Sequence, residues 1–268
     1  MTTLPAPIDH MARYRQHLLA CGFQAKPASA WDARAAQSSW KRRHDDYSEA
    51  FLARLDLSGV NSVLDVGCGP GLLSLPIAAQ VQQVHALDYS RGMLDGLHAA
   101  IRAQQVDNIE PHHLSWEDDW SKLPVCDVAI ASRSLMVPEL ERALMKLDAH
   151  AAQRVYVTCT TQPRTGVLEL AALLGRQWIP MPDHRYVMEL LWDLGREPRL
   201  DYLPVSALDQ AQTAEELIRQ AEQLFGELQM NERSRIVEWH GHSPLNRLGL
   251  APTRRWAFIS WETIAQAR

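Results

Sequence analysis

The stretch Val63-Leu64-Asp65-Val66-Gly67-Cys68-Gly69-Pro70-Gly71 decides the fold of this chain. An apolar strand reaches an acid and then runs through three glycines at alternate positions into the start of a helix. Glycine has no Cβ, so this backbone can adopt positive φ and approach a ligand closely. The free N–H groups of the following helix would point into the same crevice. Asp88 ends the next expected strand, about 20 residues after the first glycine, where an acid can hold a ribose diol. The spacing therefore indicates a nucleotide or nucleoside site.

The order of the acid and the glycines indicates which kind of nucleoside ligand the site would bind. Pyrophosphate-binding loops read Gly-x-Gly-x-x-Gly, whereas this loop reads Asp-x-Gly-x-Gly-x-Gly. A carboxylate here would repel a diphosphate and suit a positively charged ligand. The pattern resembles the first motif of the class I S-adenosylmethionine-dependent methyltransferases, and the resemblance runs from about Val63 to Thr160. It implies that the glycine loop cradles the amino-acid end of S-adenosyl-L-methionine, that Asp88 holds the ribose hydroxyls, and that the product is S-adenosyl-L-homocysteine.

Composition sets the outer bounds. The chain has 268 residues, of which 46% are hydrophobic and 22% charged, as expected for a soluble globular protein. Its net charge of −5 gives no support for nucleic-acid binding. The four cysteines include no Cys-x-x-Cys pair and are expected to be reduced. We find no signal peptide and no apolar run of the ~18 residues that span a membrane, so we expect a cytoplasmic protein.

Short apolar strands alternate with helices, which predicts a parallel sheet built from right-handed crossovers. Together with the resemblance, this gives an α/β, Rossmann-like, doubly wound sheet of seven mostly parallel strands, the last antiparallel, plus a helical cap. Strands are expected at 62–66, 83–88, 109–113, 126–131, 155–159, 200–205 and 255–261. The expected division is an N-terminal helical lid at 1–50 and a core at 51–268, with cap insertions at about 161–183 and 206–252.

Helices are expected before the first strand and between the later ones, from apolar spacing and capping residues. Ser90 is a candidate N-cap and Gly195 a candidate C-cap. Residues 239–249 have the composition of a loop. The expected helices cover 8–19, 47–57, 71–79, 91–104, 138–151, 184–194 and 209–229.

Ligands in open α/β sheets lie at the carboxyl ends of the strands. After the third strand, an indole beside acids suits an adenine, with Trp116 stacking and Glu117 at the polar edge; both could equally be packing and solvated residues. Ser115 stands where many members of the resembled family carry an acid. The cofactor-binding residues predicted in this way are Asp65, Gly67, Cys68, Gly69, Gly71, Asp88, Tyr89, Met93, Ser115, Trp116, Glu117 and Ser132.

The fourth strand delivers Arg133, whose guanidinium would hold a substrate carboxylate or phosphate. It could equally pair with Glu139 or Asp65 as a structural clamp. The predicted substrate-binding residues are Arg133, Trp31, Tyr47 and His184. Methyl transfer depends mainly on alignment, and a general base is needed only for an acceptor that is protonated at neutral pH. The catalytic residues are therefore unknown, with candidates His184, His240 and Tyr47.

No metal site is predicted. His240 and His242 lack a third ligand with convincing spacing. His112 and His113 would point to opposite faces of a strand.

The leading function is transfer of a methyl group from S-adenosylmethionine to a small, anionic molecule by in-line displacement. The alternatives are a protein or RNA methyltransferase, and a non-catalytic S-adenosylmethionine-binding protein or a nicotinamide dehydrogenase on the same fold. Segments such as Ser132-Arg133-Ser134-Leu135 also resemble a bacterial subgroup of the family with no assignable substrate. The expected partner is a small-molecule substrate, without nucleic acid or membrane. The oligomeric state is left open, a homodimer included.

Overall fold

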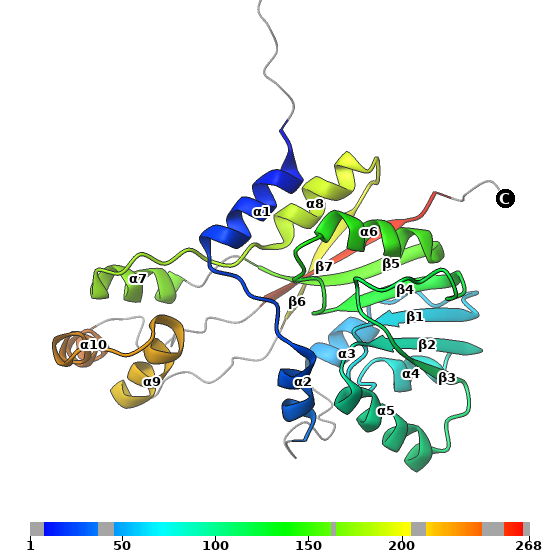
Figure 1. Ribbon diagram of the computed structural model, residues 1–268, viewed down its shortest axis with the longest axis horizontal. Helices are drawn as coiled ribbons and strands as arrows, with labels where there is room; N and C mark the ends of the chain where they lie inside the picture. The colour runs from blue at the N-terminus through cyan, green and yellow to red at the C-terminus, as the bar shows by residue number, and fades with distance from the viewer. Residues whose placement is uncertain (1–7, 37–45, 162–164, 205–212, 243–254, 265–268) are drawn as a thin grey trace, which may run out of the picture.

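The computed structural model describes residues 8–36, 46–161, 165–204, 213–242 and 255–264. Seven strands form one sheet in the order β3-β2-β1-β4-β5-β7-β6, with helices on both of its faces (Figure 1). The strands are β1 (Ser62–Val66), β2 (Gln83–Asp88), β3 (Ile109–His113), β4 (Cys126–Ser132), β5 (Ala151–Thr160), β6 (Arg199–Pro204) and β7 (Arg255–Glu262). The predicted Rossmann-like fold is confirmed.

The strand directions also match the prediction. Strands β1 to β5 pair in parallel, and β7 lies antiparallel between β5 and β6. The strand order reverses between β1 and β4. In open α/β sheets a ligand crevice opens at such a reversal, beyond the carboxyl ends of the strands. The glycine loop after β1 and the segment after β4 both enter this crevice.

Helices pack on both faces because the strands present apolar side chains on both. One face carries residues such as Leu64, Ala129 and Val155 beneath α6 (Leu140–Ala149) and α8 (His184–Asp193). The other carries residues such as Val84 and Ile130 beneath α4 (Ser74–Ala78) and α5 (Arg91–Gln104). A sheet buried on both faces is the arrangement expected for parallel strands.

The N-terminal helices pack against the core one by one. In α1 (His10–Ala20), the Tyr14 hydroxyl donates to the Val137 carbonyl at 2.8 Å, and the Tyr14 ring meets the Tyr186 ring of α8. The short helix α2 (Ala28–Ala35) lies against α5, and α3 (Asp46–Leu52) buries Tyr47 and Phe51 in the second core. The predicted lid range 1–50 thus contains three separate contacts with the core within its described residues.

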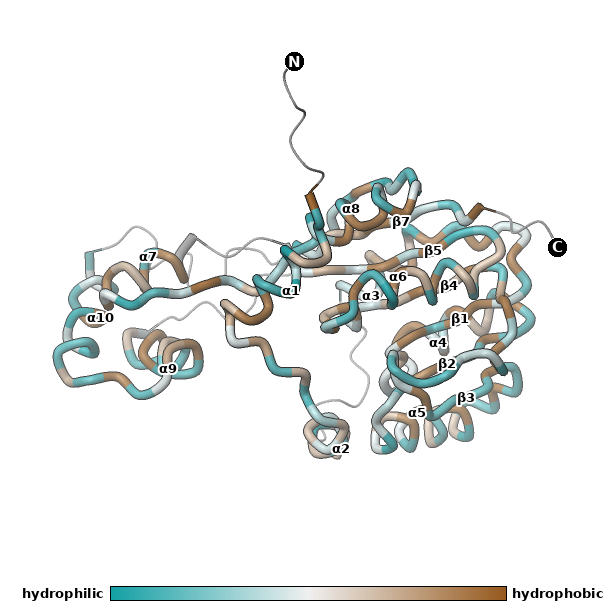
Figure 2. The backbone as a smooth tube through the Cα atoms, turned by 45° about the horizontal axis from the view of Figure 1, so that its top comes forward, coloured by the Kyte–Doolittle hydropathy of each residue, from teal (hydrophilic) through white to brown (hydrophobic). Residues whose placement is uncertain are grey.

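The two insertions form a helical cluster of their own. The helices α7 (Thr165–Leu174), α9 (Ala214–Phe225) and α10 (Met230–His242) lie together to one side of the sheet in both views (Figures 1 and 2). Their apolar side chains, among them Leu170, Leu217 and Ile236, share a small core. Within the described residues, that core contains nothing from the N-terminal helices.

Several element boundaries differ from the predicted ones; for example, the helix expected at 47–57 ends at Leu52. The helix expected at 138–151 ends at Ala149, and Ala151 already begins β5. The helix expected at 209–229 begins at Ala214, where Thr213 and Glu216 form a capping box. The prediction of a loop from 239 was wrong for 239–242, which form the last turn of α10. Residues 1–7 and 37–45 of the predicted lid, and 162–164, 205–212 and 243–252 of the predicted cap, lie outside the described residues. The last of these ranges includes 243–249 of the expected loop. No helix among the described residues is long and apolar enough to cross a membrane.

Candidate cofactor and substrate site

The three loop glycines have φ values of +77°, +55° and +87° at Gly67, Gly69 and Gly71. A Cβ on Gly67 would lie 2.4 Å from the Cβ of Ser134, and one on Gly71 would lie 2.5 Å from a methyl carbon of Leu97. The packing of the protein itself therefore requires these two glycines. Around Gly69, the nearest atom to such a Cβ is a sulfur 3.9 Å away. Gly69 thus leaves an open face on the loop that a ligand can use.

Asp88 supports the same loop from the end of β2. One carboxylate oxygen accepts the Gly69 N–H at 2.9 Å, and the other accepts the Ser90 N–H at 2.8 Å. The residue is 7% exposed, and burial raises the pKa of its carboxyl group despite these bonds. A carboxylate has about four lone-pair sites, so Asp88 keeps acceptor capacity for a ribose hydroxyl beside its bonds to the backbone.

Asp65 is buried beneath the loop, with 1% of its surface exposed. Its carboxylate accepts the Ser74 hydroxyl of α4 at 2.6 Å. Burial raises its pKa to about 7, the Ser74 bond opposes this rise, and the charge of Asp88 adds to it. Two neighbouring carboxylates in a buried crevice are stabilised by a positive charge. The amino-acid end of S-adenosylmethionine, with its ammonium and sulfonium groups, fits this requirement, and the open face at Gly69 leaves it room.

The segment after β3 brings the predicted adenine contacts to the crevice edge. The Trp116 indole N–H donates to the Ser134 carbonyl at 3.0 Å, so its half-buried ring, and not its N–H, is available to a ligand. The Ser115 N–H donates to Asp118 at 2.7 Å, and the Ser115 hydroxyl accepts the Glu117 N–H at 3.2 Å. The Glu117 side chain is exposed. The adenine role of these residues stays a prediction.

The helix α2 packs against the N-terminal end of α5, which follows the predicted ribose contact Asp88 in the chain. One Asp32 oxygen accepts the Ser90 hydroxyl at 2.6 Å and the Gly92 N–H at 2.9 Å, at the N-terminus of α5. A Cβ on Gly92 would lie 2.9 Å from the Cα of Asp32, so this glycine permits the close approach. The Lys26 ammonium group lies over the ring of Trp31 in this helix, 5.2 Å from the ring centroid. The structure therefore places Trp31 near the predicted cofactor residues, and Trp31 does not line the pocket described next.

A pocket of about 80 Å³ opens at the carboxyl ends of β4 and β5. Its wall is mostly apolar, with a few polar groups among the lining residues Tyr14, Arg133, Leu135, Met136, Leu140, Thr158, Cys159, Thr160, Pro182, Asp183, Val187 and Trp256. An apolar wall with few polar groups is the kind of lining found in small-molecule sites, whose volumes are usually about 300–1,000 Å³. At about 80 Å³, this pocket has room for only a small group.

Arg133 is held in an unusual conformation in this wall. Its φ of +59° is rare for a residue with a side chain, and its N–H donates to the Thr158 hydroxyl at 3.0 Å. The guanidinium carbon lies 4.2 Å from the centroid of the Tyr47 ring and 6.0 Å from that of Trp256. Cation–π contacts of this kind hold the charge in place while its N–H groups remain available.

The Tyr47 ring packs against the Arg133 guanidinium, and Tyr47 is not among the residues that line the pocket. Its hydroxyl is bonded at 2.6 Å to both Ser132 and Thr158. Burial raises its pKa, the positive charge of Arg133 being the largest opposing influence. A buried hydroxyl that already has two partners is poorly placed to act as a general base.

The structure also separates Arg133 from its two alternative partners. Glu139 pairs with Arg15 at 2.6 Å, and Asp65 is bonded to Ser74. No carboxylate among the described residues pairs with Arg133. Neither Glu139 nor Asp65 therefore forms the structural ion pair with Arg133 that was the alternative to substrate binding.

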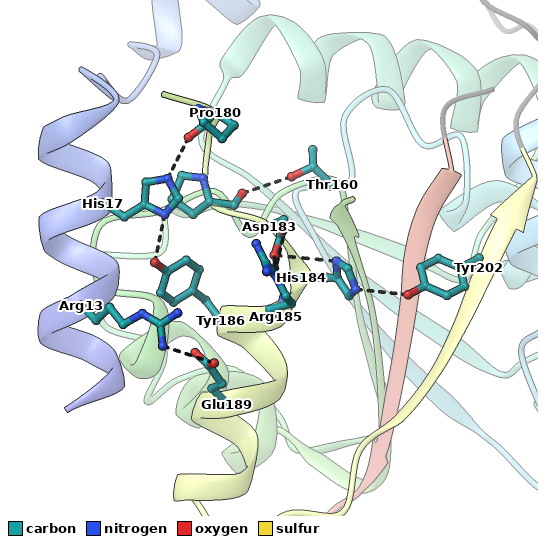
Figure 3. A network of polar contacts seen from close by, with 11 residues as sticks. Arg13, His17, Thr160, Pro180, Asp183, His184, Arg185, Tyr186, Glu189 and Tyr202 are labelled. Atoms are coloured by element: carbon teal, nitrogen blue, oxygen red, sulfur yellow. Dashed lines mark hydrogen bonds and ion pairs between the residues drawn. The ribbon is translucent and has the colours of Figure 1, made fainter. Parts of the chain in front are cut away.

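His184 lies behind the pocket wall. Figure 3 shows its ring between Asp183 and Tyr202, with Nε2 at 3.3 Å from the Tyr202 hydroxyl and Nδ1 at 3.9 Å from an Asp183 oxygen. Burial lowers its pKa, so the ring is neutral at pH 7. Asp183 itself lines the pocket, and the Arg185 side chain pairs with it at 3.0 Å. His240 and His242 belong to α10 and are not among the pocket residues.

Several contributors to the site were missed by the sequence analysis. Thr158 links Tyr47 to Arg133, Ser74 bonds Asp65, and Asp32 caps α5. A hydroxyl at the end of the fifth strand was the one available sign, because ligands collect at strand ends.

Comparisons with known proteins give the same family. Residues 63–153 match the family model described as a methyltransferase domain. An uncharacterized protein of Haemophilus influenzae is 32% identical over 261 residues, which cover 95% of this chain and 96% of that protein.

Two solved structures share the fold. Coclaurine N-methyltransferase bound to N-methylheliamine and S-adenosylhomocysteine has a TM-score of 0.53 and 14% identity, over 97% of this chain and 89% of that one. The cyclase SpnF has a TM-score of 0.55 and 17% identity, over 99% of this chain and all of that one.

The match to the methyltransferase-domain model, the sheet order and the acid-and-glycine loop together indicate the class I S-adenosylmethionine-dependent methyltransferase family. The chain belongs to that family, whose cofactor is S-adenosylmethionine.

Proposed function

We propose that the chain transfers the methyl group of S-adenosylmethionine to a small molecule with an anionic group, held by Arg133 in the pocket beside β4 and β5. The single observation that carries the proposal is the Arg133 guanidinium, which lines the pocket without a carboxylate partner among the described residues. Its fork of N–H donors matches a carboxylate or phosphate.

The position of the pocket agrees with this role. Strands β1 and β2 end at the proposed cofactor residues, and β4 and β5 end at the pocket. The Ser134 hydroxyl donates to the Val66 carbonyl at 2.7 Å, so the segment after β4 is bonded to the end of β1, directly before the glycine loop. A substrate anchored by Arg133 would lie next to the methyl-donating end of the cofactor.

Alignment would supply most of the rate. The bound cofactor provides an activated methyl group, and the chain's own task is to hold the acceptor atom in line with it and to exclude water. The apolar lining around Leu135, Leu140 and Val187 serves exclusion. Arg185 compensates the charge of Asp183, which reduces its repulsion of an anionic substrate.

The test measures S-adenosylhomocysteine formation with a panel of small carboxylates and phosphates, each paired with its neutral ester or amide. We expect turnover of an anionic acceptor and little of its neutral partner. Arg133→Met should raise KM for that acceptor at least about tenfold, the order for one charge-assisted hydrogen bond. Arg142→Met, at an exposed arginine of α6, is the matched control and should change nothing. Equal turnover of charged and neutral partners would overturn the anionic assignment. Absence of turnover across the panel, by a protein that binds the cofactor, would favour a macromolecular substrate or a non-catalytic role.

A further inference from the structure

Three potential metal ligands, none of them among the residues of the two sites described above, meet on the sheet. His85 of β2 faces Glu110 of β3 directly in the strand register, and His112 follows two residues later on the same face. Their ligand atoms all lie within 4.8 Å of one another. His113, by contrast, takes the opposite face and bonds the Tyr89 carbonyl.

The distances within this cluster match a bound metal ion. His85 Nδ1 lies 3.1 Å from His112 Nε2 and 3.4 Å from a Glu110 oxygen, and His112 Nε2 lies 3.8 Å from the other Glu110 oxygen. Ligand atoms at ordinary zinc–nitrogen and zinc–oxygen distances, in tetrahedral geometry, are about 3.4 Å apart. The 3.1 Å contact is a hydrogen bond between the two imidazoles, so an ion that contacts all three residues would take the place of its shared proton.

The burial and the charge state of these side chains also suit metal coordination. The imidazoles are 12% and 19% exposed, whereas Glu110 is 58% exposed and opens the cluster to solvent. Burial is the main cause that lowers the pKa of both histidines. Both rings are therefore neutral at pH 7, the form that binds metals. Water can reach the ion from the Glu110 side to complete its coordination.

The architecture explains why such a cluster can exist here. The connection from β3 to β4, residues 114–125, contains no helix, so this part of the sheet face lacks the usual helical cover of a doubly wound fold. Pro111, between two of the ligands, restricts the backbone that presents them. Among the described strands, β3 pairs with β2 alone. An ion at this point would tie the edge strand to the strand that ends in Asp88.

We propose that His85, Glu110 and His112 bind a divalent transition-metal ion of the zinc type, which fastens β3 to β2. Two imidazoles and one carboxylate form a donor set that zinc and its neighbours in the first transition series prefer over magnesium or calcium. The proposal stands apart from methyl transfer, since none of the three residues belongs to the cofactor loop or the pocket.

The test uses the full chain, without any histidine tag and freed of metal by a chelator, titrated calorimetrically with zinc chloride at pH 7.5. We expect one saturable site and a zinc-dependent rise in the melting temperature. His112→Asn and Glu110→Gln should each weaken zinc binding at least about tenfold, because each removes a ligand. His98→Asn, at an exposed histidine of α5, is the matched control and should bind as the natural chain does.

Circular dichroism of the metal-free variants checks their folding. Glu110→Gln keeps the shape of the side chain and serves if His112→Asn fails to fold. Cobalt provides an independent signal, since the intensity of its visible bands reports tetrahedral coordination, and we expect those bands to disappear in Glu110→Gln. Absence of saturable zinc binding by the natural chain, or equal affinity in the natural chain and both ligand variants, would overturn the proposal.

Discussion

Replacing Asp65 by asparagine should stabilise the protein at alkaline pH while weakening its hold on the cofactor. The pKa of Asp65 rises from 3.8 to about 7 on folding, mainly because the carboxylate is buried. The folded chain therefore holds this proton more tightly than the unfolded chain does. Burying the charged form lowers stability progressively as the pH rises from about 4 to about 7, and by a constant amount above that.

The size of the effect follows from the two pKa values. Their difference corresponds to about 4 kcal/mol for full ionisation, at 1.36 kcal/mol for each pH unit. Between pH 5 and pH 8, where both proteins can be handled, linkage gives a change of about 2–3 kcal/mol. The Asp65→Asn substitution keeps the size of the side chain and an oxygen for the Ser74 hydroxyl, so little else should change.

Urea unfolding of both proteins at several pH values provides the measurement. We expect the free energy of unfolding of Asp65→Asn, relative to the natural chain, to increase by about 2–3 kcal/mol from pH 5 to pH 8. Asp95→Asn, an exposed position of α5, removes the same charge and should give a flat difference. Parallel profiles for the two variants would refute the buried, proton-binding state of Asp65.

Two further predictions concern the cofactor crevice. Asp88→Ala should weaken S-adenosylhomocysteine binding by about 1–3 kcal/mol, the range for a lost charged hydrogen-bond partner; unchanged affinity in calorimetry would remove the ribose assignment. Gly69→Ala should abolish tight binding while the protein stays folded, because the new Cβ meets only a sulfur at 3.9 Å within the protein but projects from the open face of the loop. Gly59→Ala has a similar positive φ, +71°, in open space, so it should cost similar stability without affecting binding; equal loss of affinity in both variants would contradict a ligand at Gly69.

The fold could be predicted from local pattern because its strands are short, apolar and separated by clear breaks. The third strand, 109–113, has the predicted bounds, and the glycine loop indicates the crevice by itself. The missed boundaries have local causes. His150 is all that separates α6 from β5, so apolar spacing continues across the junction. The last turn of α10 was mistaken for loop because its sequence is polar and contains a glycine.

The site was harder to predict where its partners are distant in sequence. Tyr47 was expected to contact substrate, but its hydroxyl reaches Ser132 and Thr158, which lie 85 and 111 residues away. Trp256 completes the aromatic contact with Arg133 from the far end of the chain. A resemblance to a family names the residues of the common crevice, whereas such contacts depend on how this chain packs its own helices and strands.

The proposed metal ligands His85 and His112 were also not recognised as partners from the sequence. His85 and His112 are 27 residues apart, so only the parallel register of β2 and β3 brings them together. The sequence suggests only pairs of neighbouring histidines as metal ligands, namely His112 with His113 and His240 with His242. In a strand, neighbouring residues face opposite ways, and the useful partner stands on the next strand.

Calorimetric titration with S-adenosylmethionine and S-adenosylhomocysteine, with NAD as the control ligand, tests the central claim most directly. We expect both sulfur compounds to bind at one site with micromolar dissociation constants, and NAD not to bind, because the acid before the glycines disfavours a diphosphate. A folded chain that binds neither sulfur compound, or that binds NAD instead, would contradict the assignment of the crevice to S-adenosylmethionine.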